Sequence, residues 1–336
     1  MNILLLDQVD LLLIHALQVS PRASWRELGA TLRLDPVTLS RRWRKLSAEG
    51  VAWTTCYPNL RLSSFAFVEV DCASGARESI ISELSKDAAT YSIDCTTGRR
   101  DLFLSVIMDT LVEIDDYVEN RISALPSVNG TRTHHVRKMF AEGAGWRIGV
   151  LSNKQSQRLR SRVNEVDPQS AKTLSALEKN LIIRLGADGR RSASSVASEL
   201  GISVSAVTRG ISRILFTGRA TLRCDFAHEL SPWKAMSVMW LSIPQDQIHG
   251  AALTMAKLPQ VRVICSLASE ANVMLQLWMR SLDELDTVEQ ALSVACPQAR
   301  VLDRWIVPRI AKRMGHVLGR DGLRSGYVPL PMKGEG

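Results

Sequence analysis

The first fifty residues carry apolar positions every three or four residues, which is the spacing of amphipathic helices rather than of strands. Asp7 is a suitable N-cap for a first helix, and Ser24 and Glu27 form a capping box at the start of a second. A third helix begins after Asp35, with a proline at its first position, and ends at Gly50. Three short helices with a tight turn between the second and third predict a helix-turn-helix.

The pattern then changes, and the next segments alternate between strand-like and helical spacing. Single alternation of apolar and polar residues predicts a strand, whereas apolar residues three and four apart predict a helix. The expected strands are 66–71, 91–97, 102–108 and 131–136, and the expected helices are 77–86 and 114–125. Their order is βαββαβ, which is typical of a ferredoxin-like domain.

The second half of the chain repeats this layout. Residues of the helical region recur at an offset of 168, as the pairs Arg22/Arg190 and Gly50/Gly218 illustrate. Residues of the region that follows recur at an offset of 171, so a three-residue insertion separates the two registers. A supersecondary unit that occurs twice in order indicates an internal duplication.

We therefore expect an α+β protein that is a tandem duplicate of a winged helix-turn-helix plus a ferredoxin-like βαββαβ domain. The expected boundaries are 1–60 and 61–140 for the first unit, 141–172 for a linker, 173–230 and 231–312 for the second unit, and 313–336 for a tail. We expect the linker to be partly helical around Gln155–Val163. The tail beyond Gly319 is rich in glycine and proline, and we expect it to be disordered.

The positive charge of the chain is concentrated in the two helical regions. The net charge is +8, and segments 20–46 and 184–223 each carry seven basic residues against two acidic ones. Segment 64–140 has the opposite sign, with twelve acidic residues against eight basic ones. This distribution indicates two separate anion-binding faces rather than a uniformly basic surface.

Other classes of function find little support. The six cysteines include no CxxC pair, which argues against structural zinc and thioredoxin-like chemistry. Asp7 and Asp10 interrupt the apolar N-terminus, and no apolar segment reaches the ~18 residues of a membrane span, so we expect a cytoplasmic protein. His134 and His135 point to opposite faces of a strand, and no GxSxG, Walker or HExxH motif occurs. We expect no catalytic residue, metal or cofactor.

The third helix of each copy presents a polar face that fits the major groove of DNA. Arginine can hydrogen-bond guanine, and serine or threonine can bond phosphates or base edges. The second of these helices has Gly210 where the first has Arg42, so we expect it to bind more weakly. The candidate DNA-binding residues are Arg22, Ser24, Thr38, Ser40, Arg41, Arg42, Arg44, Lys45, Ser205, Thr208, Arg209 and Arg213.

The turn between the second and third strands of the first ferredoxin-like domain is a candidate effector site. Gly98, Arg99, Arg100 and Asp101 combine a flexible backbone with two guanidinium groups, which suits a small carboxylate ligand. The corresponding residues of the second copy, 269–272, lack both glycine and arginine, so that copy is the weaker candidate.

These motifs resemble those of the Lrp/AsnC family of transcriptional regulators. LDQVD at 6–10, RAS at 22–24 and LDPVTLSRR at 34–42 are similar to that family's winged helix-turn-helix, and TGRRDL at 97–102 to its RAM effector domain. DGRRS at 188–192 continues the match in the second half. The resemblance implies a regulator that binds an imperfect palindrome of double-stranded DNA and responds to an amino acid or similar metabolite. It also implies that one chain carries both halves of a family dimer, and it leaves further association of chains open.

Two alternatives remain open at this point. Sirohaem decarboxylases resemble the same arrangement, and they rely on His, Tyr and Arg residues near the second and third strands of the RAM-like unit. Here Tyr91–Leu104 has a tyrosine and two arginines but no histidine, and Val261–Leu275 has Arg262 alone. The other alternative is an architectural DNA binder that ignores small ligands.

Overall fold

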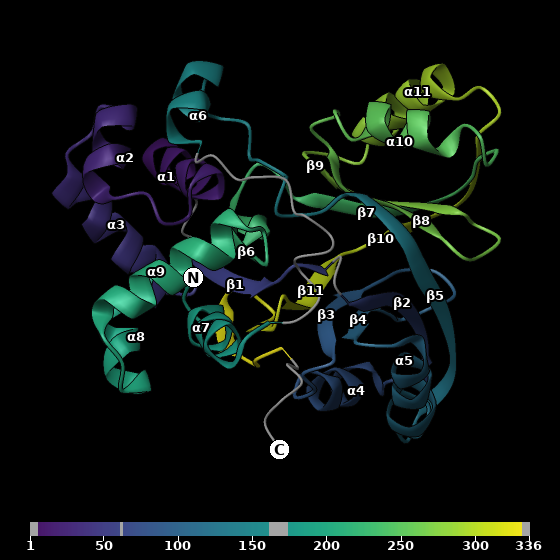
Figure 1. Cartoon of the computed structure of the whole chain (residues 1–336). Coiled ribbons are helices and arrows are strands. Elements are labelled where there is room, and N and C mark those ends of the chain that lie inside the picture. Colours follow the sequence, from purple (N-terminus) through teal and green to yellow (C-terminus); the bar gives the residue numbers. More distant parts are fainter. Residues whose placement is uncertain (1–5, 61–62, 161–173, 331–336) are drawn as a thin grey trace.

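The computed structural model describes residues 6–60, 63–160 and 174–330, and it contains the expected helical unit twice. The first unit consists of α1 (Gln8–Val19), α2 (Trp25–Leu32) and α3 (Pro36–Ala48). The second consists of α7 (Ala176–Gly186), α8 (Ala193–Leu200) and α9 (Val204–Phe216). Both units lie on one side of the molecule, away from the main sheet (Figure 1).

The starts and ends of these helices follow the expected side chains. Asp7 caps α1, Ser24 and Glu27 form a capping box on α2, and Asp35 caps α3 with a proline at its first position. Gly50 ends the third helix with a φ of 70°, a left-handed conformation that glycine adopts without strain. A Cβ at Gly50 would also lie 2.4 Å from the carbonyl oxygen of Arg324, so both the φ angle and this close contact exclude a larger residue here.

The two helical units are joined by a two-stranded antiparallel sheet. Strand β1 (Ala52–Pro58) follows α3, strand β6 (Ala220–Phe226) follows α9, and the strands pair along their whole length, from Ala52 opposite Phe226 to Pro58 opposite Ala220. Helix α7 packs on β1 and helix α1 packs on β6, so each unit contributes a helix to the other's strand. This exchange couples the two helical units.

Each helical unit is followed by a βαββαβ domain, as expected. The first domain contains β2 (Ser64–Cys72), α4 (Arg77–Leu84), β3 (Thr90–Cys95), β4 (Leu102–Met108), α5 (Leu111–Tyr117), extended by a π-helical turn (Val118–Ile122), and β5 (Val128–Ala141). The second contains β7 (Ala235–Ser242), α10 (Ile248–Met255), β8 (Val261–Leu267), β9 (Val273–Met279), α11 (Glu284–Ala295) and β10 (Arg300–Ile306). Strand orders β5-β2-β4-β3 and β10-β7-β9-β8 are those of ferredoxin-like sheets.

The two domains form one eleven-stranded sheet because the last strand of each crosses to the other. The second part of β5 pairs with β8, and β11 (Arg309–Arg313), which follows β10, pairs with β3. Between the two halves Phe103 stacks on Phe67 at 4.9 Å and meets Trp240 and Trp305 edge-on. Helices α4 and α5 cover one outer face and α10 and α11 the other, each over its own core (Figure 1). The chain thus contains an intramolecular pseudo-dimer.

The linker contains a helix, as the sequence predicts, whereas the tail is more ordered than expected. Helix α6 (Asn153–Leu159) lies within the linker, whereas residues 161–163 of the expected helix fall outside the described residues. The expectation of a disordered tail is wrong through residue 330. Strands β12 (His316–Leu318) and β13 (Arg324–Tyr327) extend the sheet beyond β11. Their backbone groups find partners: the amide of Arg324 bonds the carbonyl of Gly50 at 2.9 Å.

Candidate DNA-binding face and ligand cavity

Helix α3 presents three free cations on one face. Leu39, Trp43 and Leu46 are buried beneath it, as the helical spacing predicts. Arg41, Arg44 and Lys45 are exposed, and none of them forms an ion pair with any residue that the structure describes. Thr38 and Ser40 are half-buried beside them. A face of this composition suits a polyanion.

Val37 belongs to the same face and was not among the residues that the sequence singled out. Its side chain is 72% exposed in the first turn of α3, and Val204 is exposed in the first turn of α9. An exposed apolar side chain at the start of a recognition helix can contact the methyl group of thymine. Sequence alone could have shown only that this valine does not fit the apolar stripe of the helix.

Arg42 faces the protein rather than the solvent. Its Nη1 donates to Asp7 at 2.6 Å and to Asp10 at 3.0 Å, and these hydrogen bonds raise the pKa of the guanidinium. The prediction that Arg42 binds DNA stays a prediction, and its charge is already paired with the N-cap Asp7 and with Asp10 of α1. The pair of bonds fixes α3 against α1 and so holds the exposed cations in place.

Arg22 leaves the predicted set. Its guanidinium donates to the carbonyl oxygens of Gly189 at 2.5 Å and Arg191 at 3.0 Å, both in the other helical unit. Burial lowers the pKa of Arg22. Because both terminal nitrogens are used inside the protein, this arginine joins the two units instead of facing a ligand. Ser24 remains exposed, with its hydroxyl engaged in the capping box of α2.

Helix α9 carries a thinner version of the same face. Ser205, Thr208, Arg209 and Arg213 are exposed, and Arg213 lies 3.8 Å from a carboxylate oxygen of Glu178. The glycine at position 210 has a packing role: a Cβ there would approach the Leu181 side chain of α7 to 2.5 Å. Where α3 has the cation Arg42, α9 has Gly210, which allows closer packing of α9 on α7.

The predicted effector turn lies beside a cavity of about 360 Å³, which Arg99, Arg100 and Arg132 line. Arg100 pairs with Glu69 at 2.7 Å and Asp303 at 3.0 Å, and its guanidinium lies 3.7 Å from the centre of the Trp305 ring. The Asp101 carboxylate accepts the amide of Cys72 at 2.9 Å. Gly98 and Arg99 are exposed. An effector site at this turn stays a prediction, in which Arg99 is the arginine without a carboxylate partner among the described residues.

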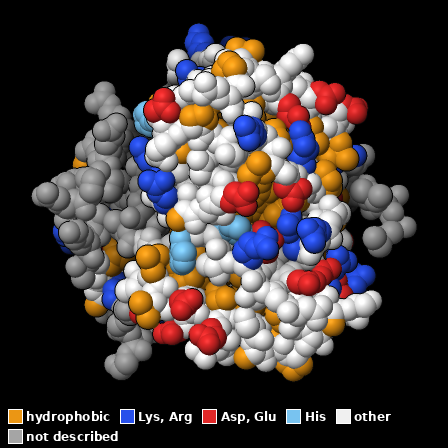
Figure 2. All heavy atoms as spheres, turned by 90° about the vertical axis from the view of Figure 1, so that its right-hand side faces the viewer, with side chains coloured by type: hydrophobic (Ala, Val, Ile, Leu, Met, Phe, Trp, Pro, Cys, Tyr) orange, Lys and Arg blue, Asp and Glu red, His pale blue; other side chains and the backbone are white. Residues whose placement is uncertain are grey.

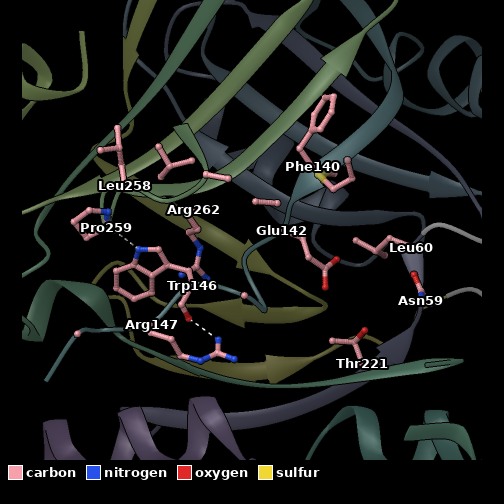
Figure 3. A pocket seen from close by; sticks show the side chains of 16 residues that line it. Asn59, Leu60, Phe140, Glu142, Trp146, Arg147, Thr221, Leu258, Pro259 and Arg262 are labelled. Carbon is pink, nitrogen blue, oxygen red and sulfur yellow. Dashed lines mark hydrogen bonds between the residues drawn. The ribbon is translucent and has the colours of Figure 1, made fainter. Parts of the chain in front are cut away.

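A larger hollow lies elsewhere, between the β1–β6 ribbon and the second ferredoxin-like domain. This outer cavity has a volume of about 1040 Å³ (Figure 3). Arg147 and Arg262 enter it from opposite sides, with Glu142 across from them and Trp146 and Leu258 in its wall. Burial and neighbouring arginines lower the pKa of Arg147 to about 10. Its Nη1 donates to the carbonyls of Ala144 and Trp146.

Behind the outer cavity lies a smaller inner cavity of about 70 Å³, between the two halves of the main sheet. Three buried arginines line or adjoin it, and two of them share one carboxylate: Arg223 and Arg262 bond Asp225 at 2.7 and 2.9 Å. The third, Arg313, lies 4.7 Å from the centre of the Trp278 ring. The sequence analysis noted Arg262 only as the one arginine of Val261–Leu275, and nothing in the sequence indicated that the three arginines lie close together.

Other kinds of site find no support in the described part of the chain. No three His, Cys, Asp or Glu side chains gather there to hold a metal ion. All six cysteines are buried, and burial raises the pKa of the Cys56 thiol to about 12. Among the described helices, none has both the length and the apolar character to cross a bilayer. The face opposite the helical units mixes acidic and basic side chains, without a patch of one sign (Figure 2).

Two family models match the first half of the chain. Residues 6–47 match the AsnC-type helix-turn-helix domain, and residues 65–145 match the Lrp/AsnC ligand binding domain. The HTH-type transcriptional regulator Ptr1 of Methanocaldococcus jannaschii is 24% identical over 144 residues, which cover 42% of this chain and 97% of that protein. The HTH-type transcriptional regulator PH0140 of Pyrococcus horikoshii is 24% identical over 132 residues, which cover 38% and 84%.

Among solved structures, the siroheme decarboxylase NirDL has a similar fold along nearly the whole chain. The alignment covers 90% of this chain and 92% of that one, with a TM-score of 0.58 and 12% identity. A second structure of NirDL, in complex with an iron-uroporphyrin III analogue, also has a TM-score of 0.58, with 13% identity and coverage of 92% and 93%. At this level of identity the likeness concerns the fold.

Proposed function

Because the first half of the chain belongs to the Lrp/AsnC family and the structure repeats its two-domain unit in the second half, we propose a regulator that binds an imperfectly symmetric operator with α3 and α9. The chain has the helix-turn-helix and the ligand-binding domain of a transcriptional regulator. One observation carries the finer proposal. Arg41, Arg44 and Lys45 lie exposed and without an acidic partner among the described residues, on the helix that this fold presents to DNA.

The two recognition helices belong to one rigid arrangement in this proposal. The β1–β6 ribbon and the exchanged packing of α1 and α7 hold the helical units together. Phosphate contacts of the exposed arginines and lysine supply most of the affinity, and Val37 and Arg41 are the expected base contacts. Because α9 carries fewer free cations, the two half-sites contribute unequally, which is why the operator is expected to be imperfectly symmetric.

The test is a gel-shift measurement on the DNA upstream of the protein's own gene. The double variant Arg41→Ala/Arg44→Ala is expected to weaken specific binding by ~1–3 kcal/mol for each lost base contact. Arg137→Ala/Lys138→Ala is the matched control, because it removes the same charge from exposed positions on β5. Equal loss in both variants, or unchanged binding in the first, contradicts the proposal.

A small metabolite is expected to modulate this binding, since the family's second domain is a ligand-binding domain. Because two carboxylates already engage Arg100, we place the ligand in the outer cavity of about 1040 Å³ rather than in the cavity of about 360 Å³ at the predicted turn. Operator affinity measured with and without amino acids and related acids tests this part. An affinity that no metabolite changes favours the ligand-insensitive architectural binder instead.

A sirohaem-decarboxylase-like enzyme is the second candidate function. The observation that favours it is the outer cavity beside buried Arg262, with buried Tyr91 in the adjoining inner cavity, since a cavity of about 1040 Å³ has room for a large ligand. Mixing the protein with uroporphyrin III decides between the two. A saturable shift of the Soret band supports the enzyme-like candidate, and an unchanged spectrum removes it.

A further inference from the structure

The two cavities share part of their lining and form one continuous feature. Leu60, Met139, Glu142 and Arg262 line both. The outer cavity has apolar walls of Trp146 and Leu258, together with Pro259. The inner cavity has room for a carboxylate group and a few waters only. The outer cavity is large enough for the rest of an organic molecule.

The inner cavity contains buried polar atoms that lack hydrogen-bond partners. Tyr91 is 2% exposed and Arg313 is 5% exposed, and both line the cavity. The hydroxyl of Tyr91 and the Nη2 of Arg313 have no hydrogen-bond partner in the structure. Leaving such groups unsatisfied costs about 1–3 kcal/mol each. Oxygen atoms of a ligand in this cavity can accept hydrogen bonds from these groups.

Several guanidinium groups gather around the two cavities. Arg147, Arg223, Arg262 and Arg313 lie among the carboxyl groups of Asp94, Asp225 and Glu142, and the charge of Glu229 also acts on Arg313. Burial raises the pKa of Asp94 to about 7, and its carboxyl accepts the amide of Gln276 at 2.8 Å. Guanidinium groups bind carboxylates in a bidentate manner, so an organic acid is the ligand class that this set of arginines suits.

The second half of the pseudo-dimer has no room for the same ligand. Trp53 stands where Thr221 lines the outer cavity, 168 residues apart. His316 from the tail lies 5.5 Å from the Trp53 ring and 4.7 Å from the Tyr327 ring, measured between ring centres. The tail amide of Gly315 also bonds the carbonyl of Tyr91, the counterpart of Arg262. The tail therefore fills the space that the other half leaves open.

We infer that the protein binds one small organic acid per chain, with its carboxylate on Arg262, Arg313 and Tyr91 and its apolar body against Trp146 and Leu258. The inference names a site and a ligand class for the effector, and it rests on the proposed function only for the regulatory consequence. Asn59 and Thr221 connect the site to DNA binding in this inference, because both line the outer cavity at one end of the ribbon that joins the helical units.

The test is isothermal titration of the full chain with four acids and one larger polycarboxylate. Benzoate, phenylpyruvate, L-leucine and L-phenylalanine probe small acids, and uroporphyrin III probes the tetrapyrrole source. Saturable binding of at least one of the four small acids with a stoichiometry near one supports the inference. A lack of saturable binding by all four overturns it, and binding of uroporphyrin III alone does the same and favours the enzyme-like candidate.

Variants locate the binding. Ala256→Trp fills the outer cavity from its rim, and Arg313→Gln removes a buried cation; each is expected to weaken binding at least tenfold. Arg132→Gln, an exposed position on β5, is the control and is expected to bind as the parent does. If Arg313→Gln does not fold by circular dichroism, Ala256→Trp decides alone. Binding that survives the cavity-filling variant overturns the inference.

DNA binding is measured separately on the same samples. Acid binding without operator binding leaves the site standing and removes the proposed regulator. Operator binding without acid binding supports the proposed regulator and removes the acid site.

Discussion

Arg22 and Arg190, which stand 168 residues apart at equivalent positions, each reach into the other's helical unit and bond two backbone carbonyls there. Arg22 donates to Gly189 and Arg191, and Arg190 donates to Pro21 at 2.6 Å and Ala23 at 3.0 Å. Burial and the neighbouring charge of Arg22 lower the pKa of Arg190 to about 10. The exchange is reciprocal, so the two helix-turn-helix units are held by a matched pair of guanidinium groups.

Replacing either member of this pair is expected to loosen both units. Arg22→Ala removes two charge-assisted hydrogen bonds, which should lower the free energy of unfolding by about 2 kcal/mol. Arg26→Ala, at an exposed position nearby, should change it by less than about 0.5 kcal/mol. Urea denaturation measures both. Equal stabilities of the two variants would show that the exchanged arginines do not hold the units together.

The two recognition helices should differ in their contribution to DNA binding. Arg209→Ala/Arg213→Ala is expected to weaken operator binding less than Arg41→Ala/Arg44→Ala, because Arg213 already faces Glu178. Fluorescence anisotropy over a range of salt concentrations measures the difference. Each lost phosphate contact should reduce the slope of log K against log salt by about 0.9. Identical losses in the two double variants would refute the ranking.

Arg42 should affect stability more than DNA affinity. Its pairs with Asp7 and Asp10 are partly exposed, so Arg42→Ala is expected to cost about 1 kcal/mol of stability. Asp10→Asn should cost a similar amount, since it breaks the same contact. The operator affinity of Arg42→Ala should fall less than that of Arg41→Ala. A variant with normal stability but DNA binding as weak as that of Arg41→Ala would overturn the assignment.

Stability should fall as the pH drops below 6.5. The Nδ1 of His15 accepts the amides of Val150 and Leu151, and burial lowers the pKa of His15 to about 4. Burial likewise lowers the pKa of His316 to about 3. Between pH 6.5 and 4 the unfolded chain takes up protons that the folded chain does not, so each histidine contributes a slope of up to about 1.4 kcal/mol per pH unit.

His15→Gln isolates this effect, because its side-chain oxygen can still accept amide hydrogens. The buried Asp94, with its raised pKa, acts in the opposite direction: its contribution to stability is lost as the pH rises from about 4 to about 7. Urea melts at pH 4.5 and 6.5 should therefore show a smaller difference for His15→Gln than for the parent. An unchanged difference would mean that His15 is not neutral in the folded protein.

The tail should stabilise the folded chain. Tyr327→Ala removes a half-buried ring that packs on His316, and the expected loss is about 2 kcal/mol. Thermal unfolding measures this loss. Binding of organic acids to the open cavity should persist, because Tyr327 lies in the filled half of the pseudo-dimer. Loss of acid binding at normal stability would place Tyr327 in the binding site.

The local elements were predictable because they depend on neighbouring residues. Capping at Asp7, Ser24 and Asp35 involves contacts over three residues, and the apolar spacing of α3 shows which side of that helix is buried. The duplication was predictable because two copies of one pattern lie in order. Such features can be predicted without knowing the tertiary contacts.

The misassigned residues depend on contacts across the duplication. Arg22 and Arg100 look like free cations in the sequence, yet their partners lie 167 and 203 residues away, at Gly189 and Asp303. The tail resembles a disordered segment in composition, but β13 pairs with β12 and so extends the sheet beyond β11. The cavity is equally hidden, because Arg147, Arg223 and Arg262 come from three segments that only the folded chain brings together.

The long strand β5, which runs from one sheet into the other, joins the halves within a single polypeptide. In a homodimer every mutation appears in both subunits, because one gene encodes both. In this chain a mutation can change one half and leave the other half as it was. Gly201 has a left-handed backbone conformation at the position where the other half has Arg33. The outer cavity is open in one half, whereas His316 of the tail packs on Trp53 at the equivalent place in the other half. Covalent fusion also prevents subunit exchange with a related protein, so every molecule contains the same two different halves.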